Sequence, residues 1–351
     1  MHTVAAVVPS SSSVLICTFN RAALLDATLD SLRRVQSAHP WEVVIIDNNS
    51  NDGTRAVIER HQRAFPVPLR YLFEGRQGKS FALNTGLEQS RGDVVLFTDD
   101  DVQVSPHWID AAIAPLAAQG DIDYTGGPVR PMWGAPPPGW IDQTRGDLWG
   151  TLAILDYGAE PFVFEARQRI PLGVNMAVRR ALIDRIGGFH TGLGRRGGSL
   201  LGQEQAEFFA RSRAAGARGL YVPAMELHHH VPRERLTKRY FRRWWFWKGL
   251  ARARVDAMHG RTELGLDLSR VPRIARVPRF VWGSLPRAAA RWAAATVRGD
   301  QQAAARHEMA CCYAAGYVRA CWMRGPLEPL RVVPGGPAPL PAGQEPASVS
   351  R

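Results

Sequence analysis

The segment of residues 94–101 joins an apolar strand directly to three aspartates, and this junction limits the folds that the chain can adopt. Its first four residues are apolar, which is typical of a buried strand. Three adjacent carboxylates repel one another, so they are stable only in open solvent or around a cation. Because side chains alternate along a strand, Asp99 and Asp101 are expected on one face and Asp100 on the other. The segment predicts a buried strand that ends at a divalent metal, with a solvated acidic turn as the alternative.

Apolar strand patterns alternate with helical patterns along the N-terminal part of the chain. The expected strands span residues 14–18, 43–47, 69–73 and 93–98, and the expected helices span residues 22–35, 54–64 and 79–89. This alternation predicts an α/β fold with a parallel sheet and right-handed crossovers. Polar residues follow the first, second and fourth strands, where ligands of such sheets bind.

The composition narrows the class of protein. With 45% hydrophobic and 22% charged residues, the chain of 351 residues has the composition of a soluble globular protein. Its formal net charge of +12 predicts an anionic partner, which is a nucleic acid, an anionic lipid or a phosphorylated substrate. The four cysteines form no CxxC pair and no disulfide framework, which favours a reducing cytoplasm. No secretory signal pattern and no apolar run of the roughly 18 to 20 residues that span a bilayer is visible, so neither export nor membrane crossing is expected.

The remaining part of the chain is less regular. Residues 126–158 are rich in Gly, Pro and Trp and predict an irregular segment, which is a long functional loop or a small irregular insert. Residues 195–202 form a glycine-rich loop, and residues 203–215 have a helical pattern. After Pro232 the chain becomes basic and aromatic, and its last residues, rich in Pro, Gly and Ala, are predicted to be disordered.

Several motifs, in consistent order over roughly residues 12–235, resemble those of the family 2 glycosyltransferases. Residues 14–21 resemble the family's first strand and its Thr-aromatic-Asn-Arg turn. Residues 45–54 resemble the motif that recognises the nucleotide base, and residues 78–86 resemble the helix start before the fourth strand. Residues 98–101 resemble the metal-binding DxD motif. Residues 173–177 and 187–189 resemble the acceptor-side segment.

The resemblance implies a GT-A type, Rossmann-like fold with a mostly parallel sheet flanked by helices and a C-terminal helical extension. Residues 1–120 are then the half that binds the nucleotide sugar, and residues 121–235 are the acceptor-binding and catalytic half. Residues 236–330 form the basic aromatic helical extension, and residues 331–351 form the disordered tail.

The resemblance also implies site residues. Those expected to bind the nucleotide sugar are Thr18, Asn20, Arg21, Asp47, Lys79, Asp99 and Asp100. An ion of Mg²⁺ or Mn²⁺ is expected on Asp101, with Asp99 and His229 beside it. A turn-capping role for Asp47, a solvated Lys79 and a structural or solvent-facing His229 are the alternatives. His228, His229 and His230 alternate along an extended segment, so they cannot all bind one ion.

The family's catalytic acid is usually part of a Glu-Asp pair at a helix start, and here the matching residues are Gln203 and Glu204. Glu204 is chemically suited to deprotonate an acceptor hydroxyl, because a carboxylate within reach is what this step requires. Glu207, one turn further along, is the reserve candidate. A charge that only stabilises the helix N-terminus is the structural alternative for Glu204.

The expected reaction is the transfer of a sugar from a nucleoside-diphosphate sugar to an acceptor hydroxyl, with inversion and metal assistance, as in the similar family 2 enzymes. The alternatives are a sugar nucleotidyltransferase and a catalytically silent module that binds a sugar nucleotide or a membrane. The first loop, residues 18–21, lacks the glycine-rich signature of the nucleotidyltransferases. The acceptor stays open, and a lipid-linked acceptor is one of the candidates.

Cationic and aromatic residues interleave between residues 233 and 254, with Trp244, Trp245 and Trp247 among them. This combination suits the surface of an anionic membrane, which predicts a cytoplasmic protein attached peripherally to the inner face of the cell membrane. The alternative is a helix that packs its aromatic side chains on the catalytic domain. No nucleic-acid-binding motif accompanies the charge, so a nucleic acid partner is not expected.

Overall fold

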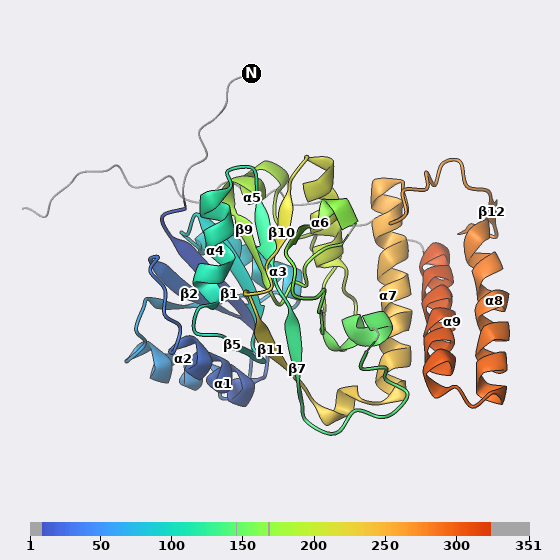
Figure 1. The fold of residues 1–351 in the computed structure, drawn as a ribbon, viewed down its shortest axis with the longest axis horizontal. Coiled ribbons are helices and arrows are strands. Elements are labelled where there is room, and N and C mark those ends of the chain that lie inside the picture. The colour runs from blue at the N-terminus through green and yellow to red at the C-terminus, as the bar shows by residue number, and fades with distance from the viewer. Residues whose placement is uncertain (1–8, 145, 168, 324–351) are drawn as a thin grey trace, which may run out of the picture.

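Parallel strands form the first half of the central sheet in this computed structural model, which describes residues 9–144, 146–167 and 169–323 (Figure 1). They are β1 (Ser12–Thr18), β2 (Trp41–Asp47), β3 (Leu69–Phe73) and β4 (Val94–Asp99), in the spatial order β3-β2-β1-β4. The apolar residues of β1, β2 and β4 are almost completely buried, as expected for parallel strands between layers of helices. The strands predicted in this region are confirmed, and their ends differ from the prediction by at most two residues.

Helices connect these strands as the pattern predicted. They are α1 (Ala22–Leu32), α2 (Thr54–Gln62) and α3 (Lys79–Gln89), and α3 packs on β1 and β2. The first two helices end before the predicted residues 35 and 64, while α3 has the predicted bounds. Because α3 begins immediately at Lys79, this residue lies at the same edge of the sheet as the end of β4.

The second half of the sheet is mixed. It contains β9 (Met176–Arg179), β6 (Tyr124–Gly126), β10 (Gly219–Tyr221) and β8 (Phe162–Val163). Strand β9 is antiparallel to both β4 and β6, and β10 is parallel to β6. The helices α4 (Trp108–Ala118), α5 (Arg180–Ile186) and α6 (Glu204–Ala214) belong to this half. Since β9 pairs directly with β4, the two halves predicted on either side of residue 120 share one sheet.

A second, smaller sheet brings the region after Asp101 next to the histidine run. It consists of β5 (Val102–Val104), β11 (Leu227–Val231) and β7 (Val129–Trp133). In the register of β5 and β11, His229 lies opposite Val102, and the His230 N–H donates to the Asp101 carbonyl at 2.8 Å. This pairing places His229 next to the end of β4, although the two are far apart in the sequence.

The prediction of an irregular loop over residues 126–158 is wrong in part, because β7 lies within it. Strand β7 is at an edge of the small sheet, where Pro131 can be accommodated without a ladder hydrogen bond from its nitrogen. The short helix η1 (Gly146–Leu152) follows later in the same segment. The proline and glycine content therefore obscured a strand that depends on pairing with a distant segment.

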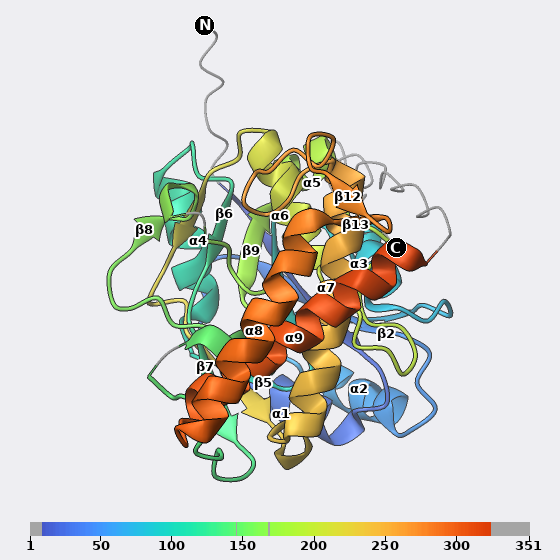
Figure 2. The same cartoon turned by 90° about the vertical axis from the view of Figure 1, so that its right-hand side faces the viewer.

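The C-terminal helices lie side by side at one end of the molecule (Figures 1 and 2). They are α7 (Lys238–His259), α9 (Gln301–Trp322) and α8 (Arg279–Val297), named here from the sheet outward. A short hairpin of β12 (Arg273–Ile274) and β13 (Val277–Pro278) precedes α8. The predicted disordered tail, residues 331–351, lies outside the described residues.

Two glycines allow α7 and α9 to approach closely. A Cβ atom added at Gly249 would lie 1.9 Å from the Tyr313 carbonyl oxygen, and one added at Gly316 would lie 1.9 Å from the Phe246 carbonyl oxygen. Any larger residue at either position would force the helix backbones apart. The helix pair is therefore specified by a reciprocal contact between a glycine and the backbone of the partner helix.

Candidate functional site

A cavity of about 830 Å³ opens at the carboxyl ends of β1 and β4. The predicted site residues that line it are Thr18, Arg21, Lys79, Asp99, Asp100, Asp101, Glu204 and His229. They come from β1 and the turn that follows it, α3, the end of β4, α6 and β11. Most of the site predicted from scattered motifs is thus brought together at one edge of the sheet.

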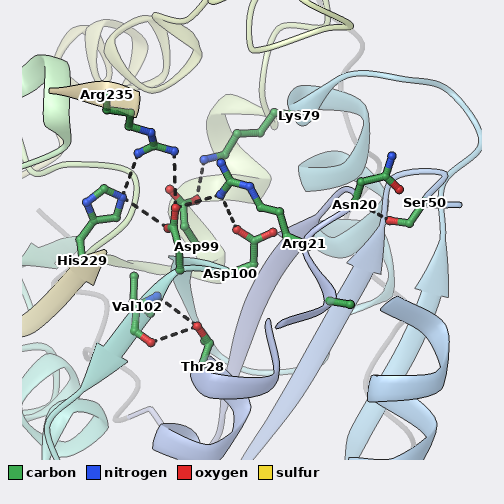
Figure 3. Close-up of polar contacts among 12 residues, drawn as sticks. Asn20, Arg21, Thr28, Ser50, Lys79, Asp99, Asp100, Val102, His229 and Arg235 are labelled. Atoms are coloured by element: carbon green, nitrogen blue, oxygen red, sulfur yellow. Dashed lines mark hydrogen bonds and ion pairs between the residues drawn. The ribbon is translucent and has the colours of Figure 1, made fainter. Parts of the chain in front are cut away.

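Basic side chains pair with each of the three aspartates (Figure 3). Lys79 Nζ donates to Asp99 Oδ1 at 2.6 Å. Arg21 Nη1 donates both to Asp100 Oδ1 at 2.8 Å and to Asp101 Oδ2 at 2.9 Å. Strand β4 ends at Asp99 and the chain turns at the next two residues, so the alternation expected for the triplet applies only as far as Asp99.

His229 and Arg235 complete the surroundings of Asp101. His229 Nε2 lies 3.4 Å from Asp101 Oδ1, and Arg235 Nη2 lies 3.5 Å from Asp101 Oδ2. Along β11 the exposed His228 alternates with the buried His229, which confirms that the three histidines point in different directions. Arg235 was counted only among the cations of the basic tail, but the short helix η3 (Arg233–Arg235) returns it to the site. No sequence signal distinguishes it from its basic neighbours.

The surroundings shift the pKa values of the three aspartates in different directions. Burial, together with the neighbouring Asp101, raises the pKa of Asp100 to about 6. Burial would also raise the pKa of Asp101, but His229, Arg21 and Arg235 stabilise its carboxylate, and the pKa lies below the ordinary value. Burial lowers the pKa of Lys79, yet Asp99 and Glu204 outweigh this effect and raise it. Asp101 is therefore ionised at neutral pH and suited to a cation.

The donor set of the triplet fits a hard divalent cation. Asp101 Oδ1 is buried and makes no hydrogen bond among the described residues, and its ion-pair neighbour His229 Nε2 lies 3.4 Å away, so the two atoms are close enough to serve one cation as ligands. Carboxylate oxygens are the ligands that Mg²⁺ prefers, and Mn²⁺ also accepts an imidazole such as that of His229.

A different group also has ligand atoms close together. The carboxylate oxygens of Asp26 and Asp30 and a ring nitrogen of His61 all lie within 4.8 Å of one another, on α1 and α2. Arg60 and His61 already form ion pairs with Asp26. None of these side chains lines the cavity, so this group is separate from the aspartate triplet.

Asn48 holds the turn that leads into α3. Its Oδ1 accepts from the Gly78 N–H at 2.8 Å, and its Nδ2 donates to the carbonyls of Glu74 and Arg76 at 3.1 and 2.7 Å. All of its amide contacts orient the backbone immediately before Lys79. Sequence reasoning had treated Asn48 only as part of a polar turn after β2, and its position beside Asp47 was the available signal.

Some predicted site residues do not line the cavity. Asn20 has a left-handed backbone with φ of 52°, and its Oδ1 accepts from the Asn51 N–H. Asp47 accepts from the Ser50 N–H at 2.9 Å and from the Tyr71 hydroxyl at 3.2 Å. These contacts match the turn-capping alternative. Direct roles of Asn20 and Asp47 toward a nucleotide stay predictions.

The acceptor-side motif divides between the cavity and the core. Gly173 lines the cavity, whereas Asn175 is completely buried. Asn175 donates to the carbonyls of Pro128 and Met225, and its Oδ1 accepts from Trp108 Nε1 at 2.9 Å. Asn175 therefore has a structural role in joining these segments.

The two candidate bases have different surroundings. Glu204 begins α6 after Gln203, whose φ of 73° turns the chain sharply, and its side chain lines the cavity half-buried. Glu207 is buried outside the cavity, and Arg211 donates to both of its oxygens at 2.8 and 2.9 Å. His259 Nε2 lies 3.3 Å from Glu207 Oε1, which links α6 to the end of α7. Glu207 is thus engaged in packing, and Glu204 is the candidate that faces the cavity.

The aromatic residues of α7 are packed rather than presented to solvent. Phe241 is completely buried, and Trp245 Nε1 donates to Thr151 Oγ1 at 3.0 Å. Trp244 and Trp247 are half-buried. This arrangement corresponds to the packing alternative. Within the described ranges, no helix is both long and apolar enough to cross a membrane.

Comparison with known sequences gives a match to the model of Glycosyl transferase family 2 over residues 13–187. The succinoglycan biosynthesis protein ExoM of Rhizobium meliloti (strain 1021) is 29% identical over 235 residues, which cover 65% of this chain and 71% of that protein. The glucosyl-dolichyl phosphate glucuronosyltransferase of Haloferax volcanii is 26% identical over 254 residues, which cover 70% of this chain and 78% of that protein.

Among solved structures, the fold is similar to that of the mannosyltransferase PcManGT from Pyrobaculum calidifontis, which was solved in complex with GDP-Man and Mn²⁺. The TM-score is 0.59 at 22% sequence identity, and the match covers 90% of this chain and 87% of that one. This similarity supports the fold. The family match contains the aspartate triplet but ends before Glu204 and His229, so the roles of these two residues depend on the geometry of the cavity.

Proposed function

The chain belongs to glycosyl transferase family 2 through residues 13–187, and we propose that this glycosyltransferase moves a sugar from a nucleoside-diphosphate sugar to an acceptor hydroxyl with inversion. The observation that carries the proposal is that the aspartate triplet and Glu204 line one cavity. The triplet would hold the metal ion that accompanies the departing nucleoside diphosphate. Glu204 would act as the base for the acceptor hydroxyl.

The donor half of the cavity is assigned to the nucleotide and its diphosphate. Arg21 and Lys79 are the cations closest to the aspartates, and charged donors of this kind bind phosphate oxygens strongly. Thr18 lies buried beside them at the end of β1, and Asp100 fixes the position of Arg21. Asn20 and Asp47 stabilise the turns after β1 and β2, and their proposed role in binding the nucleotide is to hold these turns in place.

A divalent metal is part of the proposal. Asp99, Asp101 and His229 would hold Mg²⁺ or Mn²⁺, and the distance of 3.4 Å between Asp101 Oδ1 and His229 Nε2 supports this assignment. When bound, such an ion neutralises negative charge on the departing nucleoside diphosphate.

Glu204 is the proposed catalytic base. Its carboxylate takes the proton of the acceptor hydroxyl while the acceptor oxygen forms a bond to the anomeric carbon of the donor sugar. The bond from that carbon to the diphosphate oxygen breaks, and the electron pair leaves with the nucleoside diphosphate. Because the attack occurs opposite to the departing group, the anomeric configuration inverts. No covalent sugar intermediate is needed.

A lipid-linked acceptor and a cytoplasmic location at an anionic membrane surface belong to the proposal as well. The relative from Haloferax volcanii is named for a dolichyl phosphate. Helix α8 suits such a surface better than α7, because it is the outermost helix and contains three arginines and no acidic residue. Its apolar residues Phe280, Trp292 and Val297 are 36%, 38% and 88% exposed. This combination is typical of a helix that lies on lipid headgroups.

The experiment that tests the transfer is a screen of the purified chain against nucleoside-diphosphate sugars with and without Mn²⁺. A donor should raise the melting temperature only when the metal is present, and the donor should release nucleoside diphosphate when an acceptor is added. Stabilisation that is the same without metal would contradict the metal assignment. Binding without any sugar transfer to a panel of acceptors would favour the silent module.

A further inference from the structure

One face of α7 forms part of the wall of the cavity that also contains the aspartate triplet. Tyr240, Arg243, Trp244 and Lys248 all line the cavity. Tyr240, Trp244 and Lys248 are four residues apart and form a stripe along the helix, and Arg243 lies three residues after Tyr240 at the side of this stripe. Trp149 from η1 lines the same region of the cavity. Part of the basic aromatic sequence of α7 is therefore exposed to the cavity, and neither donor binding nor the catalytic base accounts for these side chains.

Within the described ranges, neither Lys248 nor Arg243 forms an ion pair with a carboxylate, and the charge of Glu263 only partly offsets the effect of burial on the pKa of Lys248. Among the residues that the structure describes, Lys248 forms no ion pair, and its Nζ lies over the rings of Trp244 and Trp245, at 5.2 and 4.4 Å from their centroids. Burial lowers the pKa of Lys248. Arg243 Nη2 donates to the Gly198 carbonyl at 3.2 Å and pairs with no carboxylate of the described chain.

The acidic residues of this region are already neutralised or committed. Glu263 also lines the cavity, but it is 71% exposed and its Oε2 lies 3.5 Å from Arg252 Nη1. Asp156 pairs with Arg130 at 2.5 Å. Glu204 is the remaining acid of this half and is assigned to the acceptor hydroxyl. A half-buried lysine without a counter-ion is costly, and a bound anion removes this cost.

We propose that this wall binds an acceptor that is a glycosyl phosphate or diphosphate. Lys248 and Arg243 hold the phosphate group, and the sugar lies against the faces of Trp149 and Trp244. The role of this ligand as the acceptor rests on the proposed sugar transfer. The binding of a phosphate ester by these cavity residues does not depend on that transfer. The donor diphosphate is bound by a different set of cations, Arg21 and Lys79, so the site has two separate anion-binding regions.

Tryptophan fluorescence can measure this binding, because Trp149 and Trp244 both line the cavity. Glucose 1-phosphate is the soluble probe, methyl glucoside is its neutral counterpart, and a short-chain polyprenyl diphosphate sugar in micelles is the lipid-linked probe. The titrations are run with saturating UDP or GDP and Mn²⁺, which fill the donor half. Wild type should bind at least one phosphorylated probe about tenfold more tightly than methyl glucoside.

The variants distinguish binding at the cavity wall of α7 from a general effect of positive charge on the protein. Lys248→Met should weaken binding of the phosphorylated probe about tenfold, and Lys248→Arg should stay within about twofold of wild type. Arg239→Met is the matched control, because Arg239 lies on the same helix, is exposed and does not line the cavity. This control should bind like wild type. Dependence on Lys248 with the soluble probe, the lipid probe or both supports the site and identifies the source of the phosphate.

Two results would overturn the inference: equal binding of methyl glucoside and both phosphorylated probes, or equal loss in Lys248→Met and Arg239→Met. The melting temperature with nucleoside diphosphate and Mn²⁺ is measured for every variant in parallel. If no nucleotide stabilises the wild-type chain, the proposed sugar transfer fails, whereas the fluorescence titration without nucleotide still decides the phosphate site.

Discussion

Lys79 and Asp99 form an ion pair of 2.6 Å that joins the first residue of α3 to the last residue of β4. Arg21 connects Asp100 and Asp101 in the same way. The three carboxylates of the triplet are therefore paired with the chain's own cations. A nucleoside diphosphate with its metal offers these cations new partners and the carboxylates a new counter-ion, so donor and metal should bind together.

The first prediction concerns Asp101. Asp101→Asn should reduce metal-dependent nucleotide binding and sugar transfer by about a hundredfold or more, since a ligand that stabilises several kcal/mol of developing charge is lost. Isothermal titration of nucleoside diphosphate with Mn²⁺ measures the binding. Asp184→Asn, an exposed change on α5 away from the cavity lining, is the control and should behave like wild type. Mn²⁺-dependent affinity that survives in Asp101→Asn would exclude Asp101 as a ligand.

The second prediction distinguishes Glu204 from Glu207. Glu204→Gln should keep donor binding and lose about 10²- to 10⁴-fold in turnover, because the base is removed while the shape of the side chain is kept. Glu207→Gln should instead lower the free energy of unfolding by about 1 to 3 kcal/mol, because Arg211 loses its buried carboxylate partner. Turnover and urea unfolding are measured for both. A folded but inactive Glu207→Gln beside an active Glu204→Gln would reverse the assignment.

The third prediction uses the pH dependence of stability. Two hydrogen bonds from the Arg76 side chain, with a further one from Thr85, lower the pKa of Glu74 to about 2 from the ordinary 4.5. Since the pKa is depressed in the folded state, this carboxylate stabilises the fold above pH 4.5 and loses the effect as the pH falls from 4.5 to 2. The contribution at neutral pH is about 1 to 3 kcal/mol.

Urea unfolding of wild type and Glu74→Gln at several pH values checks this contribution. The variant should be less stable by that amount at pH 7, and the difference should shrink steadily below pH 4.5. Glu59→Gln, which removes an exposed helix pair with Arg55, should show little difference at any pH. A constant difference between wild type and Glu74→Gln across this range would refute the pKa shift as its cause.

The fourth prediction concerns the contact between α7 and α9. Gly316→Val should destabilise the chain by about 1 to 3 kcal/mol or more, because its side chain would collide with the Phe246 carbonyl at the helix crossing. Gly299→Ala is the control for glycine replacement in general. Its Cβ meets nothing within 4 Å, although its φ of 72° adds a smaller backbone cost. Thermal unfolding measures both, and equal losses would show that the close helix contact is not decisive.

Much of the fold followed from local patterns in the sequence. Buried strands such as β1 and β4 are continuous apolar runs, and Lys79 stands at a helix start, so the edge of the sheet could be predicted. The predictions of the glycosyltransferase family, of the GT-A fold and of a sugar-transferring enzyme are confirmed. Strand β7 escaped prediction because Pro131 suits only an edge strand, and the edge depends on the distant β11.

The rest of the site could not be predicted for a similar reason. Arg235 differs from the other cations of its run only because η3 returns it to Asp101. Lys248 and Trp149 both line the cavity because α7 packs on η1, and no motif encodes this packing. The interleaved cations and aromatic residues of α7 could not decide between membrane contact and packing, because Trp244 lines the cavity while Phe241 is buried, and membrane contact stays a prediction. Contacts between segments far apart in sequence decide these cases.

The last prediction concerns membrane contact through α8. Arg287 and Arg291 are exposed on this outermost helix, and Trp292 is 38% exposed beside them. An exposed cation near an anionic surface contributes about 1 kcal/mol, so replacing both arginines by glutamine should weaken vesicle binding about 30-fold at low salt. The affinity of wild type should fall as ionic strength rises, because salt screens the attraction. Trp292→Ala should reduce binding even at low salt, since its ring is lost from the headgroup region.

Co-sedimentation with anionic and neutral vesicles measures the effect. The double variant Arg55→Gln with Arg63→Gln, in the distant α2 region, is the matched control because it loses the same charge. Equal binding by the two double variants would assign any membrane contact to the overall charge of +12 rather than to α8.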